Sequence, residues 1–178
     1  KDPRNQWELL DELDDKLADK YFVNFSVFQS MPDVWALEQV FPILPIDRLT
    51  ERPDRNAVLE DLTCDSDGRI DHYVDSEGVE SPLSLHSPRP RERYCVAMFL
   101  VGAYQETLGD IHNLFGDTDS VSVRVRGKRC EVVEAHRGDT TDRLLGYVGY
   151  DPNALRMAYR ARISAAKLAP EEAKTILH

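Results

Sequence analysis

The chain has 178 residues, three cysteines, a formal net charge of −10 and an isoelectric point near 4.9. This acidity argues against nucleic acid or an anionic membrane as the main partner, and no apolar run approaches the ~20 residues that span a bilayer. An odd number of cysteines without CxxC spacing argues against a disulfide framework or a zinc site, and it favours a reducing cytoplasm.

The N-terminal part is expected to form a helix, a strand and then shorter elements. One helical face is predicted by apolar residues three or four positions apart: Leu10, Leu13, Leu17 and Tyr21. Aromatic and β-branched residues over 21–28 are typical of a strand. Pro32 and Asp33 predict the start of a short helical turn over 31–37, and the two prolines within 41–47 require an extended chain there.

The middle of the sequence is dominated by strand patterns. Strands are predicted over 57–63 and 69–74, with a turn between them. Residues 81–94 are rich in proline and serine, which indicates a loop around one short strand. The continuous apolar run over 94–104 predicts a strand that is covered on both faces. Alternating valines before a Gly-Lys turn predict a hairpin over 120–135.

The C-terminal part has a helical pattern. Helices are predicted over 140–150, 151–167 and 169–178. Asp151 is a natural N-cap, and Pro152 suits the first helical position. The second of these helices is expected to bury a stripe of three residues: Leu155, Tyr159 and Ile163. The third helix stops within its apolar face, from which a truncated chain is expected.

These patterns together predict an α+β protein in three parts. Residues 1–20 form a leading helix, residues 21–137 form a β-rich domain, and residues 138–178 form a helical segment. Helices therefore precede and follow one region of strands, as in α+β architectures.

One acidic segment, DLTCDSDGRIDHYVD at residues 61–75, combines a thiol with five aspartates. Aligning Gly68 with the glycine of an EF-hand loop leaves Thr63 at the first ligand position and a valine at the last, which argues against calcium. Two interpretations remain open. Asp-Ser-Asp-Gly suits an Asx-type turn with Gly68 at positive φ. Alternatively, Cys64 beside Asp65 at a strand end suits a proton donor next to a cation-binding carboxylate.

Four motifs in this sequence resemble those of one enzyme family: DKYFVNFSVFQSMPD, FPILPIDRL, DLTCDSDGRIDHYVD and FLVGAYQETLGDIHNLFGDTD. Together they are similar to the C-terminal part of the biosynthetic arginine decarboxylases, pyridoxal-phosphate enzymes of the alanine-racemase-like class. The resemblance runs from about Leu13 to about Pro152. It implies that the β-rich domain is mainly antiparallel, as a Greek-key-like barrel or sandwich, and that the cofactor's lysine lies on a (β/α)₈ barrel outside this sequence.

The resemblance also implies roles for individual residues. Cys64 would protonate the carbon that has lost CO₂, and Asp65 would hold the guanidinium of the substrate. A carboxylate suits a guanidinium because it accepts two parallel hydrogen bonds. In the motif Gly102-Ala103-Tyr104, the phenol of Tyr104 would donate to the cofactor phosphate, with Gly102 beside it.

Two positions depart from the related ornithine decarboxylases. Phe25 stands where those enzymes carry an aspartate, so guanidinium binding must use other groups. His112 stands where they carry a phenylalanine. His112 is therefore a candidate for contact with substrate or cofactor, and equally a candidate for a hydrogen-bonded loop histidine.

The function implied by the resemblance is conversion of L-arginine to agmatine and CO₂ in polyamine biosynthesis, in the cytoplasm. The implied cofactor is pyridoxal 5′-phosphate, with Mg²⁺ as a further candidate. The implied assembly is a homodimer or higher homo-oligomer with its active site at the subunit interface. Two alternatives stay open: a non-catalytic β-rich module that retains the motifs by descent, and a decarboxylase of the same class acting on another basic amino acid.

Overall fold

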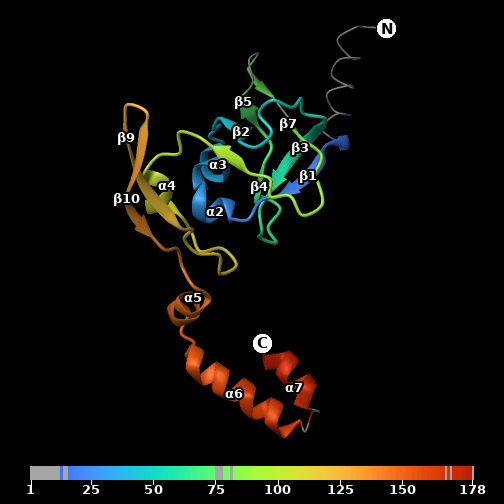
Figure 1. Cartoon of the computed structure of the whole chain (residues 1–178), viewed down its shortest axis with the longest axis vertical. Helices are drawn as coiled ribbons and strands as arrows, with labels where there is room; N and C mark the ends of the chain where they lie inside the picture. The colour runs from blue at the N-terminus through green and yellow to red at the C-terminus, as the bar shows by residue number, and fades with distance from the viewer. Residues whose placement is uncertain are drawn as a thin grey trace. The chain divides into compact units, whose positions relative to one another are not determined.

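The computed structural model describes residue 13 and residues 16–74, 78–80, 82–166, 168 and 170–177 (Figure 1). The chain divides into two compact units, residues 1–118 and residues 119–178, which are described in turn. The predicted leading helix falls mostly outside the described residues. Of its expected face, Leu13 and Leu17 are helical, whereas Tyr21 lies in a strand.

The first unit is built from short strands and three short helices among the described residues. In chain order they are β1 (Asp19–Phe22), α2 (Val27–Ser30), α3 (Pro32–Leu37), β2 (Ile43–Pro45), β3 (Arg55–Glu60), β4 (Arg69–Ile70), β5 (Tyr73–Val74), β6 (Val79–Glu80), β7 (Leu83–Leu85), β8 (Val96–Met98) and α4 (Tyr104–Leu108).

Strand β3 is central to the largest sheet of this unit (Figure 1). It pairs in parallel with β1, and antiparallel with both β7 and β4. Two further antiparallel pairs join β2 to β8 and β5 to β6. The prediction of an α+β protein with mainly antiparallel strands is confirmed in this coarser form. The described strands form no closed barrel, and the Greek-key barrel or sandwich stays a prediction.

Most local predictions for this unit are confirmed, but three are wrong in part. The single strand predicted over 69–74 is instead β4 and β5, which pair with β3 and β6 respectively. The strand predicted over 21–28 gives way to helix α2, because the Ser26 side chain accepts a hydrogen bond from the Gln29 backbone N–H at 3.3 Å and so caps a helix. Of the apolar run over 94–104, only β8 is a strand. Its partner β2 has three residues, and Leu100 beyond it has a φ of 62° and is 85% exposed.

The core of the first unit lies around β3, whose side chains alternate between interior and surface. Ala57 and Leu59 point inward and are 0% and 1% exposed. They join a cluster of buried apolar side chains: Val27, Met31, Phe41, Ile43, Ile70, Tyr73, Leu83 and Leu85. The Tyr73 hydroxyl accepts from the Leu59 backbone N–H at 2.9 Å and donates to the Ile70 carbonyl. Burial raises the pKa of Tyr73 above its usual value.

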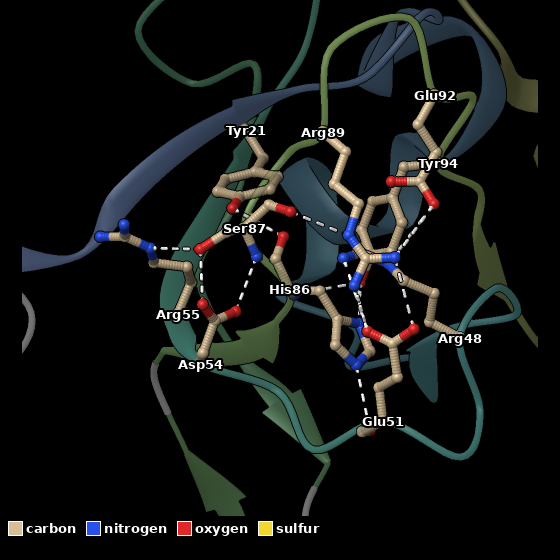
Figure 2. A network of polar contacts seen from close by, with 10 residues as sticks. All are labelled: Tyr21, Arg48, Glu51, Asp54, Arg55, His86, Ser87, Arg89, Glu92 and Tyr94. Atoms are coloured by element: carbon tan, nitrogen blue, oxygen red, sulfur yellow. Dashed lines mark hydrogen bonds and ion pairs between the residues drawn. The ribbon is translucent and has the colours of Figure 1, made fainter.

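A polar network packs beside this core and centres on the buried side chain of His86 (Figure 2). The ring Nδ1 lies 2.8 Å from the Tyr94 hydroxyl, and Nε2 lies 3.1 Å from the Glu51 carbonyl oxygen. The His86 carbonyl accepts from the Tyr21 hydroxyl at 3.0 Å. One histidine therefore joins β1, the loop before β3 and the loop after β7.

Arg48 and Asp54 extend the same network (Figure 2). The Arg48 guanidinium lies over the Tyr94 ring, 4.9 Å from its centroid, and donates to the Ser87 carbonyl at 3.0 Å. The Ser87 hydroxyl and backbone N–H donate to the Asp54 carboxylate at 2.6 and 2.7 Å. These two hydrogen bonds lower the pKa of Asp54 below its usual value.

The second unit begins with the predicted hairpin. Its strands are β9 (Ser120–Arg126) and β10 (Arg129–His136), paired antiparallel around a turn in which Gly127 has a φ of 59°. Every residue of both strands is exposed. A left-handed turn residue matches the twist of a tight hairpin, which explains the glycine there.

Three helices complete the second unit: α5 (Thr141–Tyr147), α6 (Pro152–Ala165) and α7 (Pro170–Leu177). The predicted N-cap is confirmed, because the Asp151 carboxylate accepts from two backbone N–H groups at 2.9 and 3.3 Å. The predicted buried stripe is wrong within this unit. Leu155 and Tyr159 are 43% and 50% exposed and Ile163 is half-buried, because α5 and α7, the other helices of this unit among the described residues, are short. None of the described helices is long and apolar enough to cross a membrane.

Candidate active site

The acidic segment forms the turn between β3 and β4, and a buried carboxylate holds it in place. Asp61 is 2% exposed, and its side chain accepts hydrogen bonds from the Val27 backbone N–H at 2.9 Å and from the Thr63 backbone N–H and hydroxyl at 2.7 Å each. The Asp61 backbone N–H donates to the Gly68 carbonyl at 2.7 Å. The turn is therefore tied to helix α2 as well as to itself.

The predicted Asx-type turn is present, but the reason for its glycine differs from the expected one. The Asp65 carboxylate accepts from the Asp67 backbone N–H at 3.0 Å, as an Asx turn requires. Gly68 does not have the expected positive φ. A Cβ at Gly68 would instead lie 2.3 Å from Asp61 Oδ1 and 2.7 Å from Thr63 Oγ1, so the position needs a residue without a side chain.

Two neighbouring residues of this turn meet two neighbouring residues of a distant loop. Cys64 is exposed, and its Sγ lies 3.5 Å from Asn113 Nδ2. Asp65 Oδ2 lies 3.3 Å from His112 Nε2. The structure thus brings Cys64, Asp65 and His112, three of the residues singled out in the sequence, into one place.

Helix α2 supports the loop that carries His112. The His112 ring stacks on Phe28 with ring centroids 4.2 Å apart, and the Phe28 carbonyl accepts from the Asp110 backbone N–H at 3.0 Å. A Cβ at Gly109 would lie 2.4 Å from the Gln29 carbonyl oxygen, so the loop can approach the helix this closely only with glycine. Helix α2 therefore anchors the Asp61 turn and the His112 loop together.

Gly102 and Tyr104 lie apart from this cluster in terms of direct contacts. Gly102 is exposed, Tyr104 is 75% exposed at the start of α4, and the Tyr104 hydroxyl makes no hydrogen bond within the described part of the chain. Helix α4 is fixed by buried Gln105, whose amide exchanges two hydrogen bonds with the backbone N–H and carboxylate of Asp33. A freely presented hydroxyl at a rigid position fits a donor to a phosphate.

The residues that the structure describes form no cluster of ligands for a metal ion. Among the side chains that the structure describes, no three of the types His, Cys, Asp or Glu gather as ligands. A cavity of about 350 Å³ lies beside the turn, and its lining includes Trp35, Asp67 and His72 but neither Cys64 nor Asp65. The Cys64 thiol is thus presented at the surface outside this cavity.

Reasoning from sequence missed three residues that hold the site together: Asp61, Gln105 and Asn113. Each is a polar residue fixed by contacts with residues distant in sequence. Such residues leave no periodic signal, whether buried like Asp61 and Gln105 or exposed like Asn113, because their partners come from other elements. The one usable signal was the position of Asp61 near the end of the strand predicted over 57–63, just before the predicted turn.

The comparisons with known proteins place the chain in a class and then in a family. Residues 141–178 match the family described as arginine decarboxylase C-terminal helical extension. The chain is 55% identical over 175 residues to the biosynthetic arginine decarboxylase of Xanthomonas campestris pv. campestris. The matched region covers 98% of the chain and 28% of that relative. It is 59% identical over 167 residues to the biosynthetic arginine decarboxylase of Alkalilimnicola ehrlichii. This match covers 93% of the chain and 27% of that relative.

A solved structure agrees with these relatives. The crystal structure of the biosynthetic arginine decarboxylase SpeA from Campylobacter jejuni matches with a TM-score of 0.75 and 42% identity, over 89% of this chain and 27% of that one. The predicted resemblance to the biosynthetic arginine decarboxylases is therefore confirmed over nearly the whole of this chain. The chain spans 28% or less of the length of these relatives.

Proposed function

We propose that this chain forms the C-terminal part of a pyridoxal-phosphate-dependent arginine decarboxylase, which converts L-arginine to agmatine and CO₂. The observation that carries the proposal is that a turn held by buried Asp61 presents Cys64 and Asp65 side by side, with His112 of a distant loop against Asp65. Similarity to enzymes named for arginine supports this substrate over ornithine or diaminopimelate. This activity would belong to a longer protein, because the relatives are more than three times as long as this chain.

Cys64 is the proposed proton donor. When bound, pyridoxal phosphate supplies an electron sink that lets the bond between the α-carbon and the carboxylate break. After the loss of CO₂, the Cys64 thiol would give its proton to that carbon, so that a C–H bond would form as the S–H bond breaks. Water then returns a proton to the sulfur. An exposed thiol at a rigid turn suits a donor that must reach a substrate held by another part of the protein.

Asp65 is the proposed anchor for the guanidinium. An ionised carboxylate offers about four lone-pair sites. In this structure the Asp67 backbone N–H occupies one site on Oδ1, and His112 lies against Oδ2. The remaining sites are sufficient for a two-pronged guanidinium. His112 would orient the carboxylate.

The assembly and the cofactor contacts belong to the same proposal. Tyr104 would donate to the cofactor phosphate, with Gly102 beside it. The apolar segment before them is unusually exposed, with Phe99 at 42% and Leu100 at 85%. Such side chains favour cover by another part of the protein, which supports a site completed at a subunit interface in a homo-oligomer. The proposed location of that assembly is the cytoplasm. Any Mg²⁺ would need ligands other than a ready-made cluster of the described residues.

The test is to change Cys64 and Asp65 separately in the full-length enzyme and to measure CO₂, agmatine and any aldehyde product. Cys64→Ala should lower turnover roughly 10²- to 10⁴-fold, because a positioned acid is lost. It should also divert product to an aldehyde through protonation at the wrong atom. Asp65→Asn should lower kcat/KM for arginine more than kcat. Ser66→Ala, at an exposed position of the same turn, is the control.

The outcomes separate the competing functions. Faster turnover of ornithine or diaminopimelate than of arginine would assign the chain to another substrate. Absence of turnover in a folded protein that binds pyridoxal phosphate would indicate a non-catalytic module. Normal agmatine production by Cys64→Ala would remove the thiol from the mechanism.

A further inference from the structure

We infer that Asn113 is a positioning residue for the Cys64 thiol, an inference that rests on the proposed function of that thiol as the proton donor. Asn113 Nδ2 lies 3.5 Å from Cys64 Sγ, and the sulfur lies 3.8 Å from Asn113 Oδ1. Both ends of one amide therefore face one sulfur. Asn113 is the residue whose side chain hydrogen-bonds this thiol within the described part of the chain.

The contact is part of a paired arrangement. His112 lies against Asp65 while the next residue, Asn113, lies against Cys64. Two consecutive residues of one loop thus meet two consecutive residues of the turn, although 49 positions separate Cys64 from Asn113. Orientation of the substrate anchor and of the proton donor would then come from a single loop.

The backbone of that loop explains why asparagine suits the position. Asn113 has a φ of 53° and Leu114 a φ of 61°, so two successive residues are left-handed. Asparagine tolerates this conformation better than most residues with a side chain. The turn is closed by the Phe115 backbone N–H, which donates to the His112 carbonyl at 3.1 Å. The amide is therefore carried on a backbone that is itself constrained.

The amide suits both states of a proton donor. While the thiol holds its proton, S–H can donate to Asn113 Oδ1. After the proton has passed to the substrate carbon, the sulfur carries a negative charge, and Nδ2–H can donate to it. A carboxylate at this position would lack the donor, and a hydrocarbon would lack both functions. The same side chain can thus accompany Cys64 through donation and through reprotonation by water.

The test compares three variants of the full-length enzyme. Asn113→Gly removes the amide and keeps a residue that accepts the left-handed backbone. Asn113→Asp keeps the shape but replaces the N–H donor with a negative charge. Leu114→Gly is the control, because it loosens the adjacent left-handed position without removing a contact to the sulfur. Turnover, KM, the ratio of aldehyde to agmatine, and the alkylation rate of Cys64 by iodoacetamide are measured for each, with peptide mass spectrometry resolving Cys64 from the other cysteines.

Loss of a hydrogen bond to a charged group lowers the corresponding rate or equilibrium constant by about 10- to 100-fold. Asn113→Gly should lower kcat by about that factor with little change in KM, and raise the aldehyde fraction. It should also slow alkylation of Cys64 although access improves, because the thiolate loses its donor. Asn113→Asp should lower both kcat and the alkylation rate of Cys64 further than Asn113→Gly does. Leu114→Gly should change neither.

Three results would overturn the inference. The first is an aldehyde fraction unchanged in both Asn113 variants while Cys64→Ala raises it. The second is faster alkylation in Asn113→Gly, which would make Asn113 a shield. The third is an equal effect in Leu114→Gly, which would assign the change to loop flexibility. A wild-type enzyme that does not act on arginine would instead overturn the proposed function, while alkylation would still report on the contact between Asn113 and the sulfur.

Discussion

The two units of this chain are stabilised in different ways. In the first unit, strands, helices and loops converge on a core in which side chains such as Val27 and Leu85 are 0% exposed. In the second unit, both faces of the β9–β10 hairpin are exposed and α6 has no buried residue. The first fold is specified by long-range packing, whereas the second is specified by local signals such as caps and a hairpin turn. A site that needs fixed geometry therefore belongs in the first unit.

The largest difference is expected when one apolar side chain is truncated in each unit. Leu59→Ala in the core should reduce the free energy of unfolding by about 2–5 kcal/mol. Val123→Ala in the hairpin, where the side chain is 53% exposed and faces Val132 across the strands, should reduce it by about 0.2–1 kcal/mol. Urea unfolding followed by circular dichroism measures both. Similar values for the two variants would mean that the hairpin is buried as deeply as the core.

Two glycines should respond with opposite signs. Gly68→Ala should destabilise the first unit by about 1–3 kcal/mol, because its Cβ would collide with the buried Asp61 carboxylate. Gly146→Ala should stabilise α5 by about 0.5–1 kcal/mol, because the new Cβ would meet open space on a helix. Thermal unfolding of the two variants gives the comparison, and a neutral Gly68→Ala would show that the turn can relax.

The buried phenol of Tyr73 should make the first unit sensitive to alkaline pH. Burial raises its pKa in the folded state, so its contribution is complete below about pH 10, the ordinary value, and is lost as pH rises further. Tyr73→Phe should cost about 1–3 kcal/mol at neutral pH, because the buried Leu59 N–H loses its acceptor. The variant should also lose less stability between about pH 9 and pH 11 than the wild type. Equal losses in that range would assign the sensitivity to other groups, such as Tyr21 and Tyr94, whose pKa values burial also raises.

The smallest contrast between two variants is expected at the cap of α6. Asp151→Ala removes the side chain that accepts from the Asn153 and Ala154 backbone N–H groups, and it should cost about 1 kcal/mol of helix stability. Asp151→Ser, which keeps a capping oxygen, is the matched control. Far-UV circular dichroism should show a loss of helix only for the alanine variant. The unfolding of the first unit should not change.

The fold could be predicted from sequence where the signal is local. The N-cap at Asp151, the hairpin turn at Gly127 and the short helix after Met31 were all found, because each depends on residues next to it in the chain. The long strand over 94–104 was wrong because an apolar run does not reveal how long its partner strand is. The prediction of a strand over 21–28 was wrong beyond Phe22, because the cap at Ser26 starts helix α2 within that segment.

The candidate site was predictable only through resemblance and position. Cys64 and Asp65 stand at a strand end, and the structure confirms a turn at that place and brings His112 to it. Spacing alone could not pair residues separated by 49 positions, as Cys64 and Asn113 are. It also could not show that Gly68 is required by close approach to Asp61, because that distance depends on how the turn closes.

The hydrogen bonds of His86 make that side chain a spectroscopic reporter. The Glu51 carbonyl can only accept, so in the neutral ring Nε2 carries the proton and Nδ1 accepts from the Tyr94 hydroxyl (Figure 2). The Tyr94 oxygen in turn accepts from the His86 backbone N–H at 3.2 Å. A single tautomer is thereby selected, and imidazole nitrogen chemical shifts distinguish the two tautomers. The nuclear magnetic resonance signal of one histidine therefore reports whether the loop before β3 and the loop after β7 remain in contact.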